Sequence, residues 1–97
     1  MNTSHLEIRF PAKALRTNNA ALDLALSAEA FREALHLALQ RHLPNVLAAV
    51  SIDDSASGMK VQATADDEAA ARAIEREAED LIWVVRQCED WTRMVSP

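Results

Sequence analysis

One long amphipathic stretch near the end of the chain limits the possible fold more than any other feature. Between Asp67 and Val95, apolar residues recur at the spacing of an α-helix, about 3.6 residues per turn. The resulting stripe contains Ala70, Ile74, Ala78, Leu81, Val85 and Cys88, with Ala71, Ile82 and Val84 at its edges. A stripe of this width predicts a helix that packs one face against the core of a domain. A helix over the whole stretch would be about 43 Å long, whereas a domain of this size has a radius of gyration of about 13 Å.

The opposite side of the same stretch combines charged residues with a second apolar seam. Trp83 lies among the charges, and Trp91 and Met94 lie on their flank. Tryptophan is the residue type that most often anchors protein interfaces, and an exposed apolar patch usually marks a contact. We therefore predict that this seam binds a partner, which is either a second copy or a foreign protein. The alternatives are that Trp83 covers a loop of its own chain, or that the helix breaks near Asp80. The predicted contact residues are Trp83, Trp91 and Met94, with Arg76, Glu79, Gln87 and Asp90 as a polar rim around them.

Composition sets further limits on the class of protein. A chain of 97 residues with 49% hydrophobic residues predicts a single domain over residues 1–97 with a two-layer core. The formal net charge is −5, whereas a free-standing nucleic-acid binder is usually basic, so nucleic acid is not expected as a direct ligand. One cysteine allows no internal disulfide, which fits a reducing cytoplasm. The sequence contains neither a run of about 18 apolar residues that would span a membrane nor a recognisable signal peptide.

Two segments in the first half of the chain alternate between apolar and polar residues. His5–Phe10 reads as a half-buried strand that ends at Pro11. Leu22–Leu26 also alternates, and Ser27 then has the chemistry of a helix N-cap. The helix that follows extends to Leu43. A competing interpretation begins this helix at Asn19, because alanine and leucine are strong helix formers.

The second half of the chain predicts a hairpin followed by the long helix. The strands are expected at Val46–Asp53 and Met59–Ala65, on either side of a polar turn that contains the only glycine, Gly58. The spacing of Thr64 and Asp67 resembles a capping box at the helix start. Together the elements predict an α+β sandwich, an antiparallel sheet with two helices packed on one face and a long C-terminal helix. The order is ββαββα, which a weak repeat at an offset of 39 residues supports, or βαββα if Leu22–Leu26 is helical.

Residue types that carry chemistry are present but do not form a known motif. Asp53, Ser55, Ser57 and Gly58 match the first half of a calcium loop, but Thr64 stands where the loop needs glutamate. The histidines His5, His36 and His42 have no zinc-ligand spacing, and Cys88 lies on the predicted core stripe without an activating base. We therefore expect no enzymatic activity, no metal site and no cofactor.

Two segments resemble a known family. The opening strand His5-Leu6-Glu7-Ile8-Arg9-Phe10-Pro11 and the later run Ala65-Asp66-Asp67-Glu68-Ala69-Ala70-Ala71-Arg72-Ala73 are similar to the small dimerising subunit of the KEOPS tRNA-modifying complex. That family has the order βαββα and an Asp-x-x-Ala-x-Arg-Ala run at the start of its last helix, matched here by Asp67, Ala70, Arg72 and Ala73. The stretch Pro11–Ala30 departs from the family pattern. The aromatic residue that the family has near the middle of its last helix is also out of register with Trp83. The resemblance covers roughly half of the chain and implies a non-catalytic dimeric scaffold for t6A synthesis.

The sequence thus predicts a small acidic cytoplasmic module that binds protein, as a homodimer or as a regulatory or scaffold subunit of a complex. Three more specific hypotheses remain beside it. The first is an acidic inhibitor encoded by a mobile element, such as an anti-CRISPR protein, and the second is the KEOPS-like scaffold. The third is a nucleic-acid-binding module that uses Arg9, Lys13, Arg16 and Lys60 or the open face of the sheet.

Overall fold

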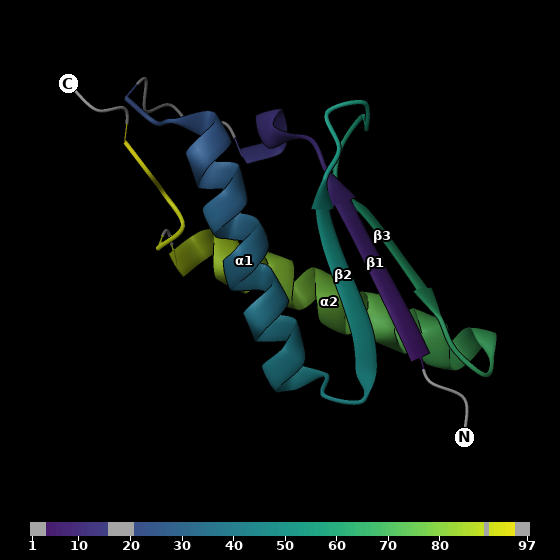
Figure 1. Ribbon diagram of the computed structural model, residues 1–97. Coiled ribbons are helices and arrows are strands. Elements are labelled where there is room, and N and C mark those ends of the chain that lie inside the picture. The colour runs from purple at the N-terminus through teal and green to yellow at the C-terminus, as the bar shows by residue number, and fades with distance from the viewer. Residues whose placement is uncertain (1–3, 16–20, 89, 95–97) are drawn as a thin grey trace.

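A computed structural model describes residues 4–15, 21–88 and 90–94 of the chain (Figure 1). Its elements are β1 (Ser4–Phe10), a short 3-10 helix η1 (Ala12–Leu15), α1 (Leu24–His42), β2 (Val46–Ile52), β3 (Lys60–Thr64) and α2 (Glu68–Cys88). The α+β class and the long last helix are confirmed, and the strands and α-helices follow the order βαββα.

The three strands form a mixed sheet in the order β2-β1-β3, so the expectation of a fully antiparallel sheet is wrong. The first two strands are parallel, with Ser4 opposite Val46, because α1 returns the chain to the end at which β1 began. The third strand lies on the other side of β1 and is antiparallel to it, with Glu7 opposite Gln62. No repeat of two ββα units exists in the described part of the chain.

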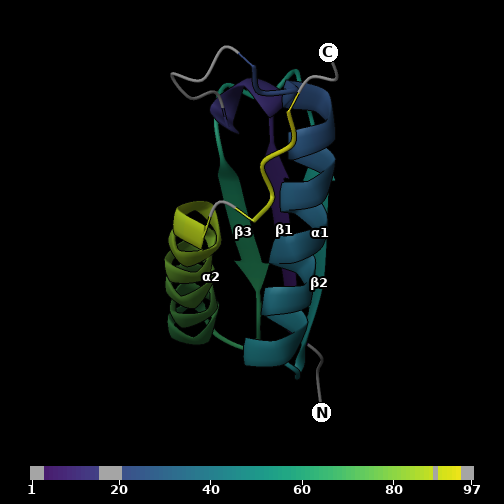
Figure 2. The ribbon, with the colours of Figure 1, turned by 90° about the vertical axis from the view of Figure 1, so that its left-hand side faces the viewer.

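The core lies on the face of the sheet to which Leu6, Ile8 and Phe10 point, and all three are fully buried. Both helices contribute to this core, and β1 and β3 are visible between them in Figure 2. The Phe10 ring packs edge-on against Phe31 of α1, with ring centroids 5.5 Å apart. The other face of the sheet carries exposed side chains from all three strands and is covered by none of the described elements.

The first helix starts earlier than the alternation of Leu22–Leu26 predicted. Helix α1 begins at Leu24, and Asp23 is its N-cap because the Asp23 carboxylate accepts a hydrogen bond from the Leu26 N–H at 3.1 Å. Only Leu22 has extended pairing, in an isolated bridge to Met94. The strand prediction is therefore wrong beyond Leu22, and so is the prediction of Ser27 as the cap. The alternative helix start at Asn19 lies outside the described residues.

The second helix ends at Cys88, about two turns before the predicted end at Val95, which itself lies outside the described residues. At its start, the Asp67 carboxylate accepts the Ala70 N–H at 2.7 Å, so Asp67 caps the helix. The 21 residues of the helix give a length of about 32 Å. Ala78 and Leu81 of the predicted stripe are buried, and Ile74, Ile82 and Val85 are half-buried beside the core.

The outer edge of β3 receives a hydrogen bond partner from α2. The Glu75 carboxylate accepts the Ala63 N–H at 2.9 Å. Antiparallel strands alternate between residues that bond to the neighbour and residues that point away, and Ala63 is one of the latter. The Glu75 side chain therefore covers part of the outer edge of β3, which would otherwise be open to pairing with another strand.

Candidate functional site

The outward side of α2 around Trp83 is the strongest candidate for a functional surface. The Trp83 side chain is 64% exposed, and Val84 next to it is 50% exposed. Figure 2 shows α2 at the border of the molecule, with no other described element on its outer side. Trp83 does not cover a loop of its own chain within the described residues, and α2 continues unbroken past Asp80.

The exposure of Trp83 is a large amount of apolar surface for one residue. A tryptophan side chain buries about 150–250 Å² when it is enclosed, so the exposed part corresponds to about 130 Å². At about 25 cal/mol per Å², covering that area would contribute about 3 kcal/mol to an association. Among side chains of α2, Trp83 therefore offers the largest gain in free energy from contact with a partner.

Trp91 does not belong to this exposed surface, and the prediction of a continuous seam with Trp83 is wrong. Trp91 is 3% exposed and packs edge-on against Phe31, with ring centroids 5.4 Å apart. Its indole Nε1–H donates to the Arg86 carbonyl oxygen at 3.3 Å. The physical reason is the early end of α2: once the chain leaves the helix at Cys88, it turns back and places Trp91 in the core.

Met94 is 51% exposed but lies on a different segment from Trp83. It pairs with Leu22 in an antiparallel bridge near the start of α1. This bridge is held in place by Ser27, whose Oγ accepts the Arg93 N–H at 2.9 Å and donates to the Arg93 carbonyl oxygen at 3.2 Å. Met94 therefore lies beside the start of α1 and not on α2.

The predicted polar rim is exposed throughout. Ion pairs in the described residues join Arg9 to Glu7, Arg32 to Glu29 and Arg72 to Glu68. No ion pair involves the side chains that surround Trp83 on α2, within the part of the chain that the structure describes. The exposed charged and amide side chains on this surface are Arg76, Glu79, Asp80, Arg86 and Gln87. We call these residues together with Trp83 the Trp83 surface. Asp90, which was predicted for the same rim, lies beyond the end of α2 and lines the groove between the two helices.

Sequence reasoning missed an apolar groove between the two helices. The groove has a volume of about 380 Å³, and Leu37, Val85 and Trp91 contribute to its walls. Leu37 is 56% exposed, although its position on α1 gave no signal of contact. The groove exists because the last turn of α2 extends past the core, which also leaves Cys88 exposed instead of buried as predicted.

Cys88, His42 and Asp90 line this groove together. These are the residue types of thiol catalysis, which needs a hydrogen bond from the thiol to a base that a third group orients. No hydrogen bond joins the three side chains, and both His42 and Cys88 are exposed. The arrangement lacks the contacts of an activated nucleophile.

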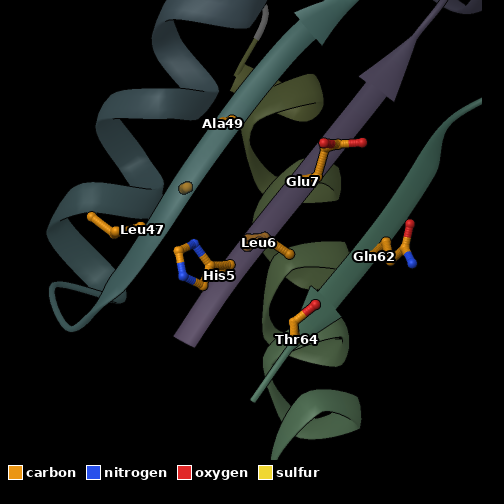
Figure 3. A pocket seen from close by; sticks show the side chains of 8 residues that line it. His5, Leu6, Glu7, Leu47, Ala49, Gln62 and Thr64 are labelled. Carbon is orange, nitrogen blue, oxygen red and sulfur yellow. The ribbon is translucent and has the colours of Figure 1, made fainter. Parts of the chain in front are cut away.

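The open face of the sheet has a shallow depression of about 400 Å³. Figure 3 shows its side chains, which include His5 and Glu7 of β1, Leu47 of β2 and Gln62 of β3. No tyrosine, phenylalanine or tryptophan lies among them, so the face lacks the row of large aromatic rings on which nucleic-acid bases usually stack. The Glu7 carboxylate also pairs with Arg9 at 2.6 Å, which offsets one of the few positive charges on this face.

In the described ranges, no group of three or more histidine, cysteine, aspartate or glutamate side chains is placed to hold a metal ion. Neither α1 nor α2 is long and apolar enough to cross a membrane. Comparisons of the chain with known protein families, with curated proteins and with solved structures gave no match.

Proposed function

We propose that the protein is a non-catalytic protein-binding module that uses the Trp83 surface of α2 as its interface. It acts as a dimer or as a regulatory or scaffold subunit of a larger complex. The observation that carries this proposal is Trp83 itself, an indole that is 64% exposed in the middle of a charged helix face. The lone cysteine Cys88, which is exposed and free, is compatible with action in a reducing cytoplasm.

The composition of the Trp83 surface favours the interpretation that it is an interface and not simply a helix face exposed to solvent. Interfaces place an aromatic anchor at the centre and polar groups at the rim. Trp83 has Glu79 and Asp80 one turn before it and Arg86 and Gln87 one turn after it. An anchor of about 3 kcal/mol is therefore surrounded by groups that remain able to form hydrogen bonds with a partner.

Replacement of Trp83 by alanine tests the proposal. We expect Trp83→Ala to weaken association at least tenfold, whether the partner is a second copy or another protein, because an interface anchor is lost. The matched control is Leu26→Ala, since Leu26 is 57% exposed on α1, away from α2. The measurements are solution mass by light scattering and quantitative capture from an extract of the source cells. The proposal fails if neither quantity responds to Trp83→Ala, or if both respond equally to Leu26→Ala.

An acidic inhibitor encoded by a mobile element, such as an anti-CRISPR protein, is a more specific version of the same proposal. The net charge of −5 supports it, because an acidic surface can occupy a basic nucleic-acid channel. Its signature would be capture of a nucleic-acid enzyme that weakens steeply with added salt.

A scaffold subunit of a KEOPS-like tRNA-modifying complex is a second version. It is supported by the order βαββα of the described elements, which is the order that the resemblance implies. Such a subunit would co-purify with the other members of the complex in a Trp83-dependent way. A direct nucleic-acid-binding role has less support, because no tyrosine, phenylalanine or tryptophan lines the depression on the open face of the sheet. A gel shift at low salt would reveal such a role.

A further inference from the structure

We propose that the Trp83 surface binds a second copy of this chain, in an antiparallel α2–α2 contact with its two-fold axis beside Trp83. This inference rests on the proposed function and names the partner. The charges along α2 support this contact, because acidic side chains come opposite basic or amide side chains when a second copy of the helix runs in the reverse direction.

Helix geometry decides which residues share a side of Trp83. At about 100° per residue, the positions four before and three after a residue lie on one side of it. Glu79 and Arg86 therefore lie together on one side of Trp83. By the same rule, Asp80 and Gln87, three before and four after, lie on the other side.

A two-fold axis that passes between the two copies, perpendicular to α2, reverses the direction of the helix in the second copy. It leaves the residues on each side of Trp83 on that same side. Glu79 then lies opposite Arg86 of the second copy, and Asp80 lies opposite Gln87 of the second copy. Every facing pair is thus an acid with a base or an acid with an amide, and Trp83 meets Trp83 at the centre.

Other arrangements of two copies do not have this match. In a parallel pair the two-fold axis runs along the helices and exchanges the two sides of Trp83, so Glu79 would face the acid Asp80 of the second copy, and Arg86 would face Gln87. Like charges in direct opposition disfavour association. The matching also distinguishes a second copy from a foreign partner, because nothing requires a surface built for another protein to complement its own reverse.

A reciprocal charge exchange tests this contact. Glu79→Arg places an arginine opposite Arg86, and Arg86→Glu places a glutamate opposite Glu79, so each variant alone should dissociate at a concentration at least fivefold higher than wild type. In an equimolar mixture, however, each contact joins an arginine of one variant to a glutamate of the other. We expect the mixture to recover dimers of mixed composition with near wild-type affinity.

The matched controls are Glu68→Arg and Arg72→Glu, which change the net charge by the same amounts. They alter the exposed 2.8 Å ion pair at the start of α2, outside the predicted contact. The measurement is sedimentation velocity over a range of concentrations, with circular dichroism to check that each variant is folded. We expect wild type and both controls to have a mass about twice 10.7 kDa, and Trp83→Ala to be monomeric.

Two results would overturn the inference. One is a wild-type monomer at the highest concentration, and the other is a dimer that the exchanges at Glu79 and Arg86 leave unchanged. If a wild-type monomer still captured another protein in a Trp83-dependent way, the proposed function would stand without the homodimer. If Trp83→Ala changed neither self-association nor capture, both would fall.

Discussion

Ser27 shows how one side chain can tie distant parts of this chain together. It is the one polar residue that is fully buried among the described residues, and both hydrogen bonds of its hydroxyl group go to the backbone of Arg93. The Asp23 N–H reinforces the same connection by donating to the Arg93 carbonyl oxygen at 2.7 Å. The segment that carries Trp91 is thereby fixed to the first turn of α1.

Removal of the Ser27 hydroxyl should therefore destabilise the fold. In Ser27→Ala, the part-buried Arg93 N–H loses its acceptor, and a donor left without a partner away from water costs about 1–3 kcal/mol. Urea denaturation of the variant against wild type measures the change in the free energy of unfolding. The control is Ser51→Ala on the exposed side of β2, for which we expect a change below about 0.5 kcal/mol. Equal stabilities of the two variants would contradict the structural role of Ser27.

Asp53 provides a test of local electrostatics. The hydrogen bond from the Ser55 hydroxyl, followed by that from the Ser55 backbone N–H, lowers the pKa of the Asp53 carboxyl. The folded state thus favours the ionised form, so its stabilising contribution is complete above about pH 4, the ordinary aspartate range, and is lost as the pH falls through the lowered folded value. We expect Ser55→Ala to raise the pKa of Asp53 in an NMR titration. Ser57→Ala, in the same loop, should leave it unchanged.

At the scale of elements, the two tryptophans of α2 and its C-terminal extension have opposite environments. Helical periodicity predicted both tryptophans on one surface, because the helical pattern of the sequence continues past Cys88, where the helix itself ends. No glycine or proline marks the end of the helix in the sequence. The end of the helix instead accompanies a tertiary contact, the packing of Trp91 against Phe31, which local sequence patterns do not report.

Alanine substitution should separate the two roles. Trp91→Ala removes a core aromatic and should cost about 3–5 kcal/mol of unfolding free energy. Trp83→Ala, at low protein concentration, should change it by less than about 0.5 kcal/mol, because an exposed side chain contributes little to folding. Chemical denaturation at a fixed low concentration measures both. A large destabilisation by Trp83→Ala would show that Trp83 serves the fold of its own chain.

Glu75 joins helix α2 to the edge of the sheet, and its replacement should loosen that edge. In Glu75→Ala the Ala63 N–H loses its acceptor, so we expect amide hydrogen exchange at Ala63 to rise about tenfold, equivalent to about 1.4 kcal/mol of local protection. Glu75→Gln keeps a carbonyl acceptor at the same position and should retain most of the protection. Similar exchange rates in the two variants would argue that the 2.9 Å contact contributes little.

For the whole molecule, the layers were predictable and the strand neighbours were not. Alternation in His5–Phe10 identified which side chains of the first strand are buried, and Leu6, Ile8 and Phe10 are indeed in the core. Alternation carries no information on which strand lies next to which, so the parallel pairing of β1 with β2 could not be deduced. At the candidate site, Trp83 was identified from helical phase, whereas the inter-helix groove depends on where α2 ends.

The molecule is also thin for its length. Its extents are 52 × 26 × 16 Å and its radius of gyration is 14.1 Å, whereas a compact chain of this length has about 12.5 Å. Such a shape leaves much of α2 uncovered, since only Ala78 and Leu81 of that helix are buried. Association along α2 would therefore supply burial that the isolated chain lacks.

If the proposed dimer forms, folding and association are linked by mass action. We expect the melting temperature of wild type to rise when the protein concentration is raised about thirtyfold, because the dimer is favoured over unfolded monomers. The melting temperature of Trp83→Ala should not depend on concentration. Calorimetry at two concentrations measures both, and a concentration-independent wild-type transition would contradict linkage through α2.

The contrast between a buried Trp91 and an exposed Trp83 also gives the protein two built-in optical reporters. The chain has no tyrosine and two tryptophans, so its near-ultraviolet emission comes from these two indoles. Loss of structure changes the surroundings of Trp91, whereas contact with a partner changes those of Trp83. Single substitutions to phenylalanine would leave one reporter at a time, and unfolding and binding could then be followed separately without any attached dye.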